Sequence, residues 1–141
     1  MRSILGHCPK LTSGIESFLK EESLTIISDN AKQDLNDAIK CILFSLSTPA
    51  AMITFRASED VLRLYYENKT QNSSGRKGWN DIIQELLKIE GTNKPFVDYL
   101  NYIRDKRNEA EHPGKIFSQS ETEHAFMQVI HLIEVISKEI K

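Results

Sequence analysis

The sequence is poor in cysteine, glycine, proline and tryptophan. Its 141 residues include two cysteines, six glycines, four prolines and one tryptophan. Cys8 and Cys41 are far apart, and neither has a second cysteine at the spacing of a zinc site, so no thiolate metal centre is predicted. We expect no metal and no cofactor, and two unpaired thiols indicate a reducing cytoplasmic setting.

A strong net charge is also missing. Eighteen basic and twenty acidic side chains give a formal net charge of -2. This balance excludes a protein that coats nucleic acid through a broad positive field. Any contact with nucleic acid must therefore be local.

Long apolar runs and the common nucleotide or hydrolase motifs are absent. The residues up to Lys10 contain no core of a secretory signal, and the most apolar stretch, residues 41–55, contains Pro49 and is too short to span a bilayer. There is no P-loop, glycine-rich dinucleotide motif, GxSxG or HExxH. We expect a cytoplasmic protein without a membrane partner.

The composition, with 40% hydrophobic and 27% charged residues, is that of one globular domain. From about residue 29 onward the apolar residues recur at helical spacing, and no stretch alternates as a strand does. The sequence predicts an all-α bundle of four to five main helices in residues 29–141, after an N-terminal extension, residues 1–28, with one short helix near 14–22. The main helices are expected at about 31–46, 49–67, 79–89, 94–111 and 118–140.

The connections between these helices are less determined. Thr48 and Pro49 have the form of an N-cap and a first-turn proline, which fits either a tight corner or one kinked rod. The polar residues 68–78 (NKTQNSSGRKG) predict the most mobile loop. Two capping boxes are possible at the last helix, one from Ser118 with Glu121 and the other from Ser120 with Glu123.

Arg107 lies on the apolar face of the helix predicted at 94–111. An arginine directed at the interior is costly unless it is paired, reaches water or lines a polar crevice. Arg107 is therefore the first candidate functional residue. On a helical wheel its face also carries Phe96, Tyr99, Leu100, Ile103 and Ala110.

His112 follows at the end of the same helix, in the sequence RNEAEH (107–112). Pro113 disfavours helical backbone at the residue before it, so His112 can turn away from the helix. A guanidinium and an imidazole at one helix end can bind a phosphodiester and transfer its protons. The alternative is structural: Arg107 pairs with a glutamate of another helix, and His112 is a surface cation at a helix C-terminus.

RNEAEH, followed by a Pro-Gly turn and a last amphipathic helix, resembles the motif of HEPN (higher eukaryotes and prokaryotes nucleotide-binding) domains. Residues 34–66 are similar to the first two helices of an uncharacterised prokaryotic HEPN branch, in which an arginine-x-x-glutamate pair is common. Here that pair is Arg56 and Glu59. The resemblance covers about residues 30–140, but the paired cysteines of an N-terminal zinc ribbon, frequent in that branch, are missing.

This resemblance implies a dimer in which the motifs of two protomers face one cleft, and a metal-independent ribonuclease. His112 would be the acid or base when the ribose 2′-hydroxyl attacks the phosphate, and Arg107 would stabilise the charged transition state. Asn108 would orient this pair. Glu59 is a weaker candidate that would hold Arg107, and the basic residues expected to contact the substrate are Arg104 and Lys115.

The partners expected on this basis are a second copy of the chain, RNA and a neutralising antitoxin or another component of a phage-defence system. The alternative is a non-catalytic domain of the same fold that binds a nucleotide, a nucleic acid or a protein. The acidic residues around the motif, Asp105, Glu109 and Glu111, offset its basic ones. RNA affinity is therefore expected to be modest.

Other candidates have simpler interpretations. His124 and His131 lie on the polar side of the last helix, which favours a solvated face over a metal site. Trp79 opens an apolar helix and is expected in the core or an interface. A row of charges on the second helix is expected to form i,i+4 ion pairs on a solvated face: Arg56, Asp60, Arg63 and Glu67.

Overall fold

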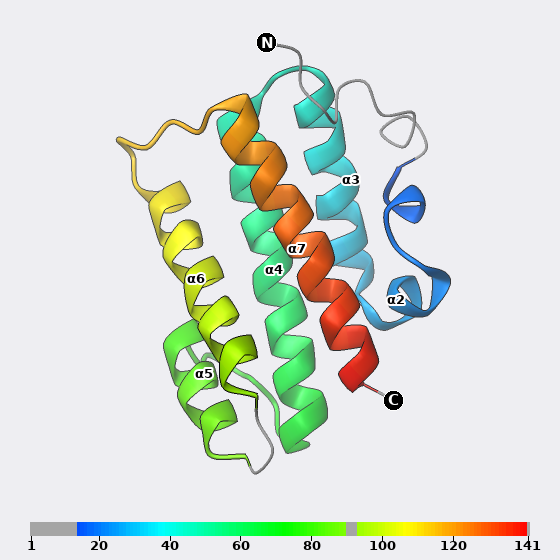
Figure 1. Ribbon diagram of the computed structural model, residues 1–141, viewed down its shortest axis with the longest axis vertical. Helices are drawn as coiled ribbons and strands as arrows, with labels where there is room; N and C mark the ends of the chain where they lie inside the picture. The colour runs from blue at the N-terminus through cyan, green and yellow to red at the C-terminus, as the bar shows by residue number, and fades with distance from the viewer. Residues whose placement is uncertain (1–13, 90–92, 141) are drawn as a thin grey trace.

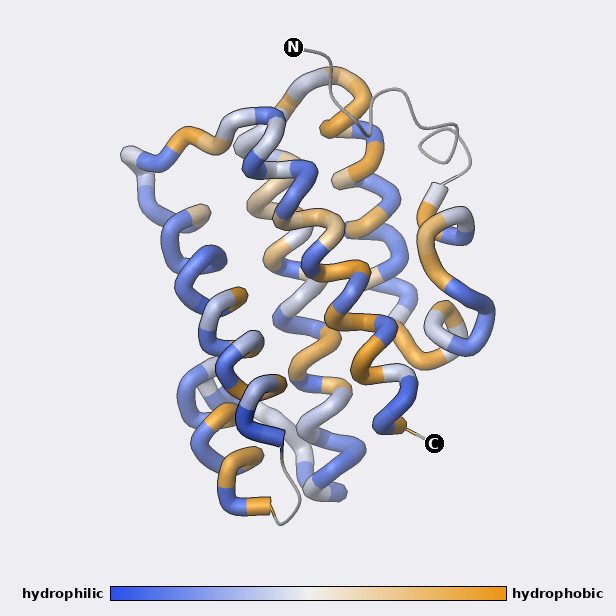
Figure 2. Tube along the Cα trace, viewed as in Figure 1, coloured by the Kyte–Doolittle hydropathy of each residue, from blue (hydrophilic) through white to orange (hydrophobic). Residues whose placement is uncertain are grey.

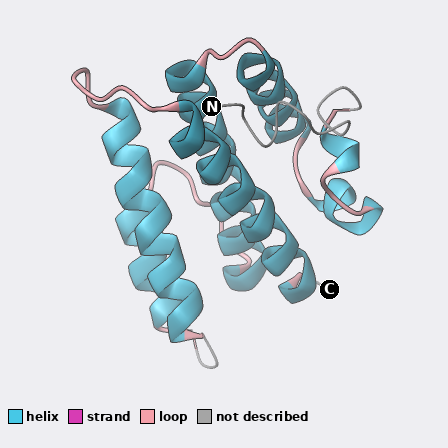
Figure 3. Cartoon of the chain, turned by 45° about the horizontal axis from the view of Figure 1, so that its top comes forward, coloured by secondary structure: helices cyan, strands magenta, loops and turns pink. Residues whose placement is uncertain are grey.

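The computed structural model describes residues 14–89 and 93–140, and these residues form only helices and loops (Figure 3). A short 3-10 helix, η2 (Ile15–Ser17), and a short helix, α2 (Glu21–Ile26), precede the longer helices. The prediction of an all-α bundle with four to five main helices is confirmed. The longer helices are α3 (Asp29–Leu43), α4 (Ser47–Thr70), α5 (Trp79–Leu87), α6 (Lys94–Glu111) and α7 (Gln119–Glu139).

Helix α4 lies at the centre of the bundle, and α3, α5, α6 and α7 all pack against it (Figure 1). Small buried residues on α4 let its neighbours approach closely, because interaxial distance depends on the side chains at the contact. In contrast, α6 is hydrophilic along most of its length, with apolar residues at intervals (Figure 2). The small buried residues of α4 are Ala50, Ala51, Ala57 and Ser58.

The chain turns a tight corner between α3 and α4, so the kinked rod is excluded. Residues 44–46 form the turn, with Ser45 at φ 58°, and the two helices run side by side in opposite directions (Figure 1). The second helix begins at Ser47 rather than at Pro49, and it continues to Thr70, three residues into the predicted loop. Gln71 ends it in the left-handed region.

The predicted single helix at 14–22 is wrong, because Lys20 has extended backbone and separates η2 from α2. Apolar residues of this segment, Ile15, Leu19 and Ile27, belong to the same buried cluster as the main helices. Ser137 of α7 donates a hydrogen bond to Ser23 at 2.8 Å. The segment therefore packs on the bundle.

None of the helices within 14–89 and 93–140 combines the length and the apolar character that crossing a membrane requires.

The loop between α4 and α5 is held by side chains of α4. Arg63 donates to the carbonyl of Lys77 at 2.7 Å, and Glu67 accepts from the backbone N–H and the hydroxyl of Ser74 at 2.7 and 2.9 Å. Tyr66 hydrogen-bonds Glu85, which also pairs with Lys77 at 2.9 Å. The loop predicted to be the most mobile is thus tied to α4 at several points.

We predict that Glu67 makes part of the stability of the fold dependent on pH. The backbone N–H of Ser74, and then its hydroxyl, hold the pKa of Glu67 below its ordinary value. A carboxylate with a lowered folded-state pKa stabilises the protein above its unfolded pKa of about 4.3. That contribution is lost as pH falls through the folded-state pKa. Urea unfolding at neutral and acidic pH should show a weaker acid-induced loss for Glu67→Gln than for wild type, and identical pH profiles would contradict this role.

At the start of α7 the structure distinguishes the two possible capping boxes. The Ser118 side chain accepts from the Glu121 backbone N–H at 3.0 Å, and Glu121 accepts from the Ser118 N–H at 3.1 Å. Lys115 adds an ion pair to Glu121 at 3.0 Å. The cap is therefore Ser118 with Glu121.

We predict that Ser118→Ala lowers the free energy of unfolding by about 1 kcal/mol, since it removes an N-cap acceptor. The matched control is Ser120→Ala, which changes an exposed serine on the same helix outside the cap. Urea denaturation of both variants measures the difference. Equal stability of the two variants would show that the cap does not contribute.

Candidate functional site

Glu59 of α4 binds two arginines at once. One carboxylate oxygen, Oε1, lies 3.0 Å from Arg63 Nη2, and the other, Oε2, lies 2.7 Å from Arg107 Nη2. Arg63 is on the same helix, four residues later, whereas Arg107 comes from α6. The side chains of all three residues are only 22–25% exposed. Glu59 therefore joins α4 to α6 and holds Arg107, as the sequence suggested.

Arg107 has two further partners. Its guanidinium carbon lies 5.9 Å from the centre of the Trp79 ring, at the start of α5, which is within cation–π range. Nη2 is also 3.3 Å from Glu111 Oε1, one turn later on α6. In both ion pairs the closest nitrogen is Nη2, and neither Nε nor Nη1 of Arg107 donates a hydrogen bond to a described residue.

A cavity of about 460 Å³ lies beside Arg107, between the first half of α4 and the last turns of α6. Its polar lining comes from Arg56, Glu59, Arg107 and Glu111. Arg56 is fixed by Asp34 of α3, to which it donates two hydrogen bonds of 2.8 and 2.5 Å. The rest of the lining is apolar and consists of Pro49, Met52, Ile53, Phe55 and Ala110. We call this space the Arg107 cavity.

His112 ends α6 with extended backbone, at φ -75° and ψ 126°, as Pro113 requires. Its side chain is exposed, and Nδ1 accepts a hydrogen bond of 3.3 Å from the N–H of Gly114. Because Nδ1 accepts this bond, its lone pair is occupied and only Nε2 is left to contact another group. The imidazole faces an open hollow of about 570 Å³ together with Asn108 and Lys115.

Within one chain, Arg107 and His112 are not brought together. They line different cavities that share no residue, and none of the contacts of Arg107 is with His112. The pairing of Arg107 with a glutamate of another helix, and the position of His112 at a helix C-terminus, match the structural alternative raised by the sequence. A single chain therefore does not assemble the proposed catalytic pair.

The supporting residues divide between the two cavities. Glu59 lies with Arg107, whereas Asn108 and Lys115 lie with His112. Lys115 is also paired with Glu121 at 3.0 Å. Arg104 lines neither cavity, because its guanidinium binds Asn80 of α5 at 2.7 Å and its neighbour Asp105 at 3.1 Å.

The expected row of i,i+4 ion pairs on α4 is wrong for most of its members. Arg56 pairs with Asp34, Asp60 with Ser28, and Glu67 with Ser74. Each of these partners lies outside α4 because neighbouring elements approach that face of the helix. The one ion pair of this spacing on α4, between Glu59 and Arg63, has a different register.

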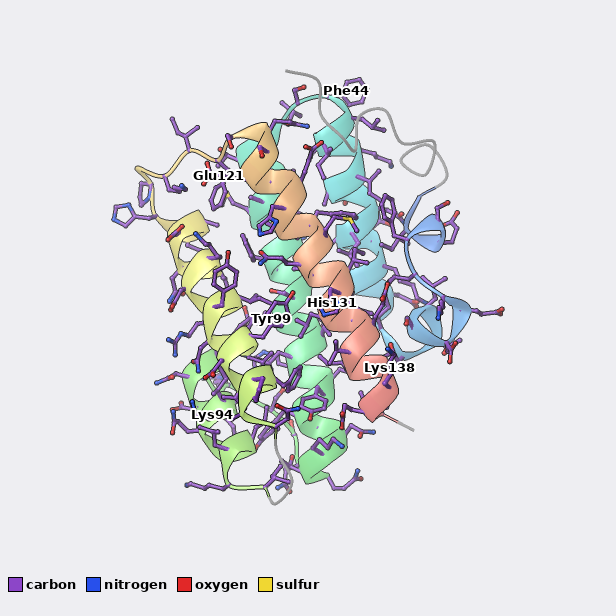
Figure 4. The ribbon with its side chains drawn as sticks, in the orientation of Figure 1. Phe44, Lys94, Tyr99, Glu121, His131 and Lys138 are labelled. Carbon is purple, nitrogen blue, oxygen red and sulfur yellow. The ribbon has the colours of Figure 1, made fainter. Side chains whose placement is uncertain are left out.

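Of the remaining candidates, the two histidines of α7 lie outside the site and Trp79 contacts it. His124 and His131 are exposed on α7, and the His131 ring meets the edge of Tyr99 from α6 (Figure 4). No group of three potential metal ligands occurs among the described residues. Trp79 is buried, as expected, but it also contacts Arg107. Glu111 and Arg63 were not predicted as partners in the site, although the i,i+4 spacing of residues 107 and 111 indicates an ion pair.

We predict that removing the shared carboxylate weakens the fold. Glu59→Ala removes the carboxylate that two partly buried arginines share and should lower the free energy of unfolding by about 1–2 kcal/mol, between the values for exposed and buried ion pairs. The control is Glu109→Ala, which removes an exposed carboxylate paired only with Lys106 on α6. Urea denaturation provides the comparison, and equal losses in both variants would contradict the linking role of Glu59.

In comparisons with known proteins, no protein-family model, no curated protein and no solved structure matches this chain.

Proposed function

We propose that the protein is a HEPN-like, metal-independent endoribonuclease whose active site combines Arg107 of one copy with His112 of a second copy. The observation that carries this proposal is where the side chains of Arg107 and His112 lie and what they contact. Arg107 is held at the wall of a cavity, and its Nε and Nη1 donate no hydrogen bond to a described residue, whereas His112 is exposed at a helix end. Because they line separate cavities of one chain, joint action requires two chains.

The reaction is intramolecular transesterification of RNA. The 2′-oxygen attacks phosphorus while His112 takes its proton, the bond from phosphorus to the 5′-oxygen breaks, and His112 returns the proton to that oxygen. The products are a 2′,3′-cyclic phosphate and a 5′-hydroxyl. Arg107 donates hydrogen bonds to the phosphate oxygens as their charge rises. For Nε2 of His112 to act as the base, the weak bond from Gly114 must open, which costs little at an exposed site.

We predict that the wild type cleaves single-stranded RNA in excess EDTA and that His112→Ala lowers the rate by at least about 100-fold, the usual contribution of an acid–base group. His124→Ala is the matched control, since it removes another exposed histidine from outside the site. Gel analysis of a labelled RNA measures both rates. An inert wild type, or equal rates for the His112 variant and wild type, would contradict the proposal.

A second prediction concerns the two-chain site. Arg107→Ala and His112→Ala should each be inactive alone, whereas an equimolar mixture should regain up to about one quarter of the wild-type activity. If the two variants pair at random, half of the dimers contain one chain of each variant. Each of these dimers has one site with both native residues and one site with neither. A mixture as inactive as its components would show that the two residues do not act across chains.

A non-catalytic binding domain is the second candidate. It is favoured by the carboxylates of Glu59 and Glu111, which already neutralise Arg107 in the free protein. On this account RNA or a nucleotide binds without being cleaved. The same assays separate the candidates, because a binding domain shifts the mobility of RNA in a native gel but leaves its length unchanged.

A further inference from the structure

The lining of the Arg107 cavity combines apolar and charged side chains. Met52, Ile53 and Ala110 supply apolar surface, and the volume of about 460 Å³ is within the range of small-molecule sites. Met52 is 48% exposed, a high fraction for a large apolar side chain on a helix. A ligand that fits this space presents a flat or apolar part to the methionine side and polar groups to the arginines.

The charged groups of the cavity favour the binding of an anion once the ion pair between Arg107 and Glu111 opens. Glu59 is held by two arginines, whereas Glu111 contacts only Arg107 and is 60% exposed. Glu111 is therefore the weaker of the two partners of Arg107. When its side chain turns to solvent, Arg63, Glu59 and Arg107 together carry one positive charge.

The arginines also retain donors for such an anion. The closest contacts of Arg107 in its ion pairs are through Nη2, and the hydrogen bonds of Arg56 to Asp34 use Nε and Nη2. Neither Nε and Nη1 of Arg107 nor Nη1 of Arg56 donates a hydrogen bond to a described residue, and both side chains line the cavity. Guanidinium groups that present paired N–H donors bind phosphate well.

We propose that the Arg107 cavity is a subsite for one nucleotide of the bound RNA, with the phosphate on Arg107 and the base against Met52, and that Glu111 competes with this phosphate. This nucleotide subsite rests on the proposed function. It adds the place where the base lies, next to the phosphate that Arg107 binds. Unpaired RNA bases are well suited to such a cavity because their flat faces are free to contact apolar side chains. The subsite makes the protein selective for single-stranded RNA.

Trp79 provides the signal for a test. It is the one tryptophan of the sequence, its indole N–H is buried without a hydrogen-bond acceptor among the described residues, and its ring lies against Arg107. The full chain labelled with ¹⁵N should therefore give one indole resonance that shifts when Arg107 binds an anion. The probes are adenosine 5′-monophosphate, ribose 5-phosphate and adenosine, which separate the contributions of base and phosphate.

We expect adenosine 5′-monophosphate to shift this resonance saturably and to bind more tightly than either fragment. Met52→Glu should weaken its binding about tenfold or more, because a carboxylate in the cavity lining repels the phosphate and removes the apolar contact of the base. Met127→Glu is the control, as Met127 is another exposed methionine, on α7, and does not line the cavity. Glu111→Gln should tighten binding about threefold, the effect of an exposed ion pair, and Glu109→Gln should not.

The nucleotide subsite is overturned if adenosine 5′-monophosphate leaves the Trp79 resonance unchanged, or if Met52→Glu and Met127→Glu bind it equally well. It is also overturned if the resonance moves only with protein concentration, because a second copy then fills the cavity. The role of Glu111 is overturned if its variant and the Glu109 variant behave alike. Cleavage assays on the same variants keep the two proposals distinct: RNA cleavage without mononucleotide binding removes only the subsite, and mononucleotide binding without cleavage removes only the nuclease.

Discussion

The burial of α4 against four other helices decides where the charged groups of this protein lie. Ten residues of α4 are buried, and its polar side chains are left at the seams with neighbouring elements. There they meet partners from outside the helix: Arg56 binds Asp34 of α3, and Glu59 binds Arg107 of α6. Glu59 is the most consequential of these because it gives the partly buried Arg107 its shortest ion pair.

The same packing explains why Arg107 and His112 separate. Arg107 is in the last turns of α6 and points toward α4 and α5, where Glu59 and Trp79 receive it. Pro113 ends the helix, and His112 turns into extended backbone with its ring in solvent. A side chain fixed between helices and a side chain at a helix end face different surroundings. The proposed chemistry therefore depends on a second chain rather than on a change within one.

Helical periodicity was sufficient to predict the architecture, and the helix at 94–111 was predicted with the bounds that the structure gives. The inward position of Arg107 and the extended backbone of His112 also followed from local rules, a helical wheel and the effect of Pro113. Errors occurred where tertiary contacts overrule local ones. The charges of α4 have the spacing of i,i+4 pairs, yet Arg56 and Glu67 bind residues of other elements. Similarly, Arg107 and His112 are separated because of how α4 and α5 pack against α6. This packing does not follow from the spacing of residues in the sequence.

The central claim is that one RNA phosphate lies between Arg107 of one copy and His112 of another. The most direct measurement is a crystal structure of the protein with a short RNA that carries a 2′-deoxy group at the scissile nucleotide, which prevents the attack. We expect two chains per RNA, with a phosphate within hydrogen-bond distance of Arg107 from one chain and His112 from the other. A phosphate bound by Arg107 with no histidine of either chain beside it would contradict the account.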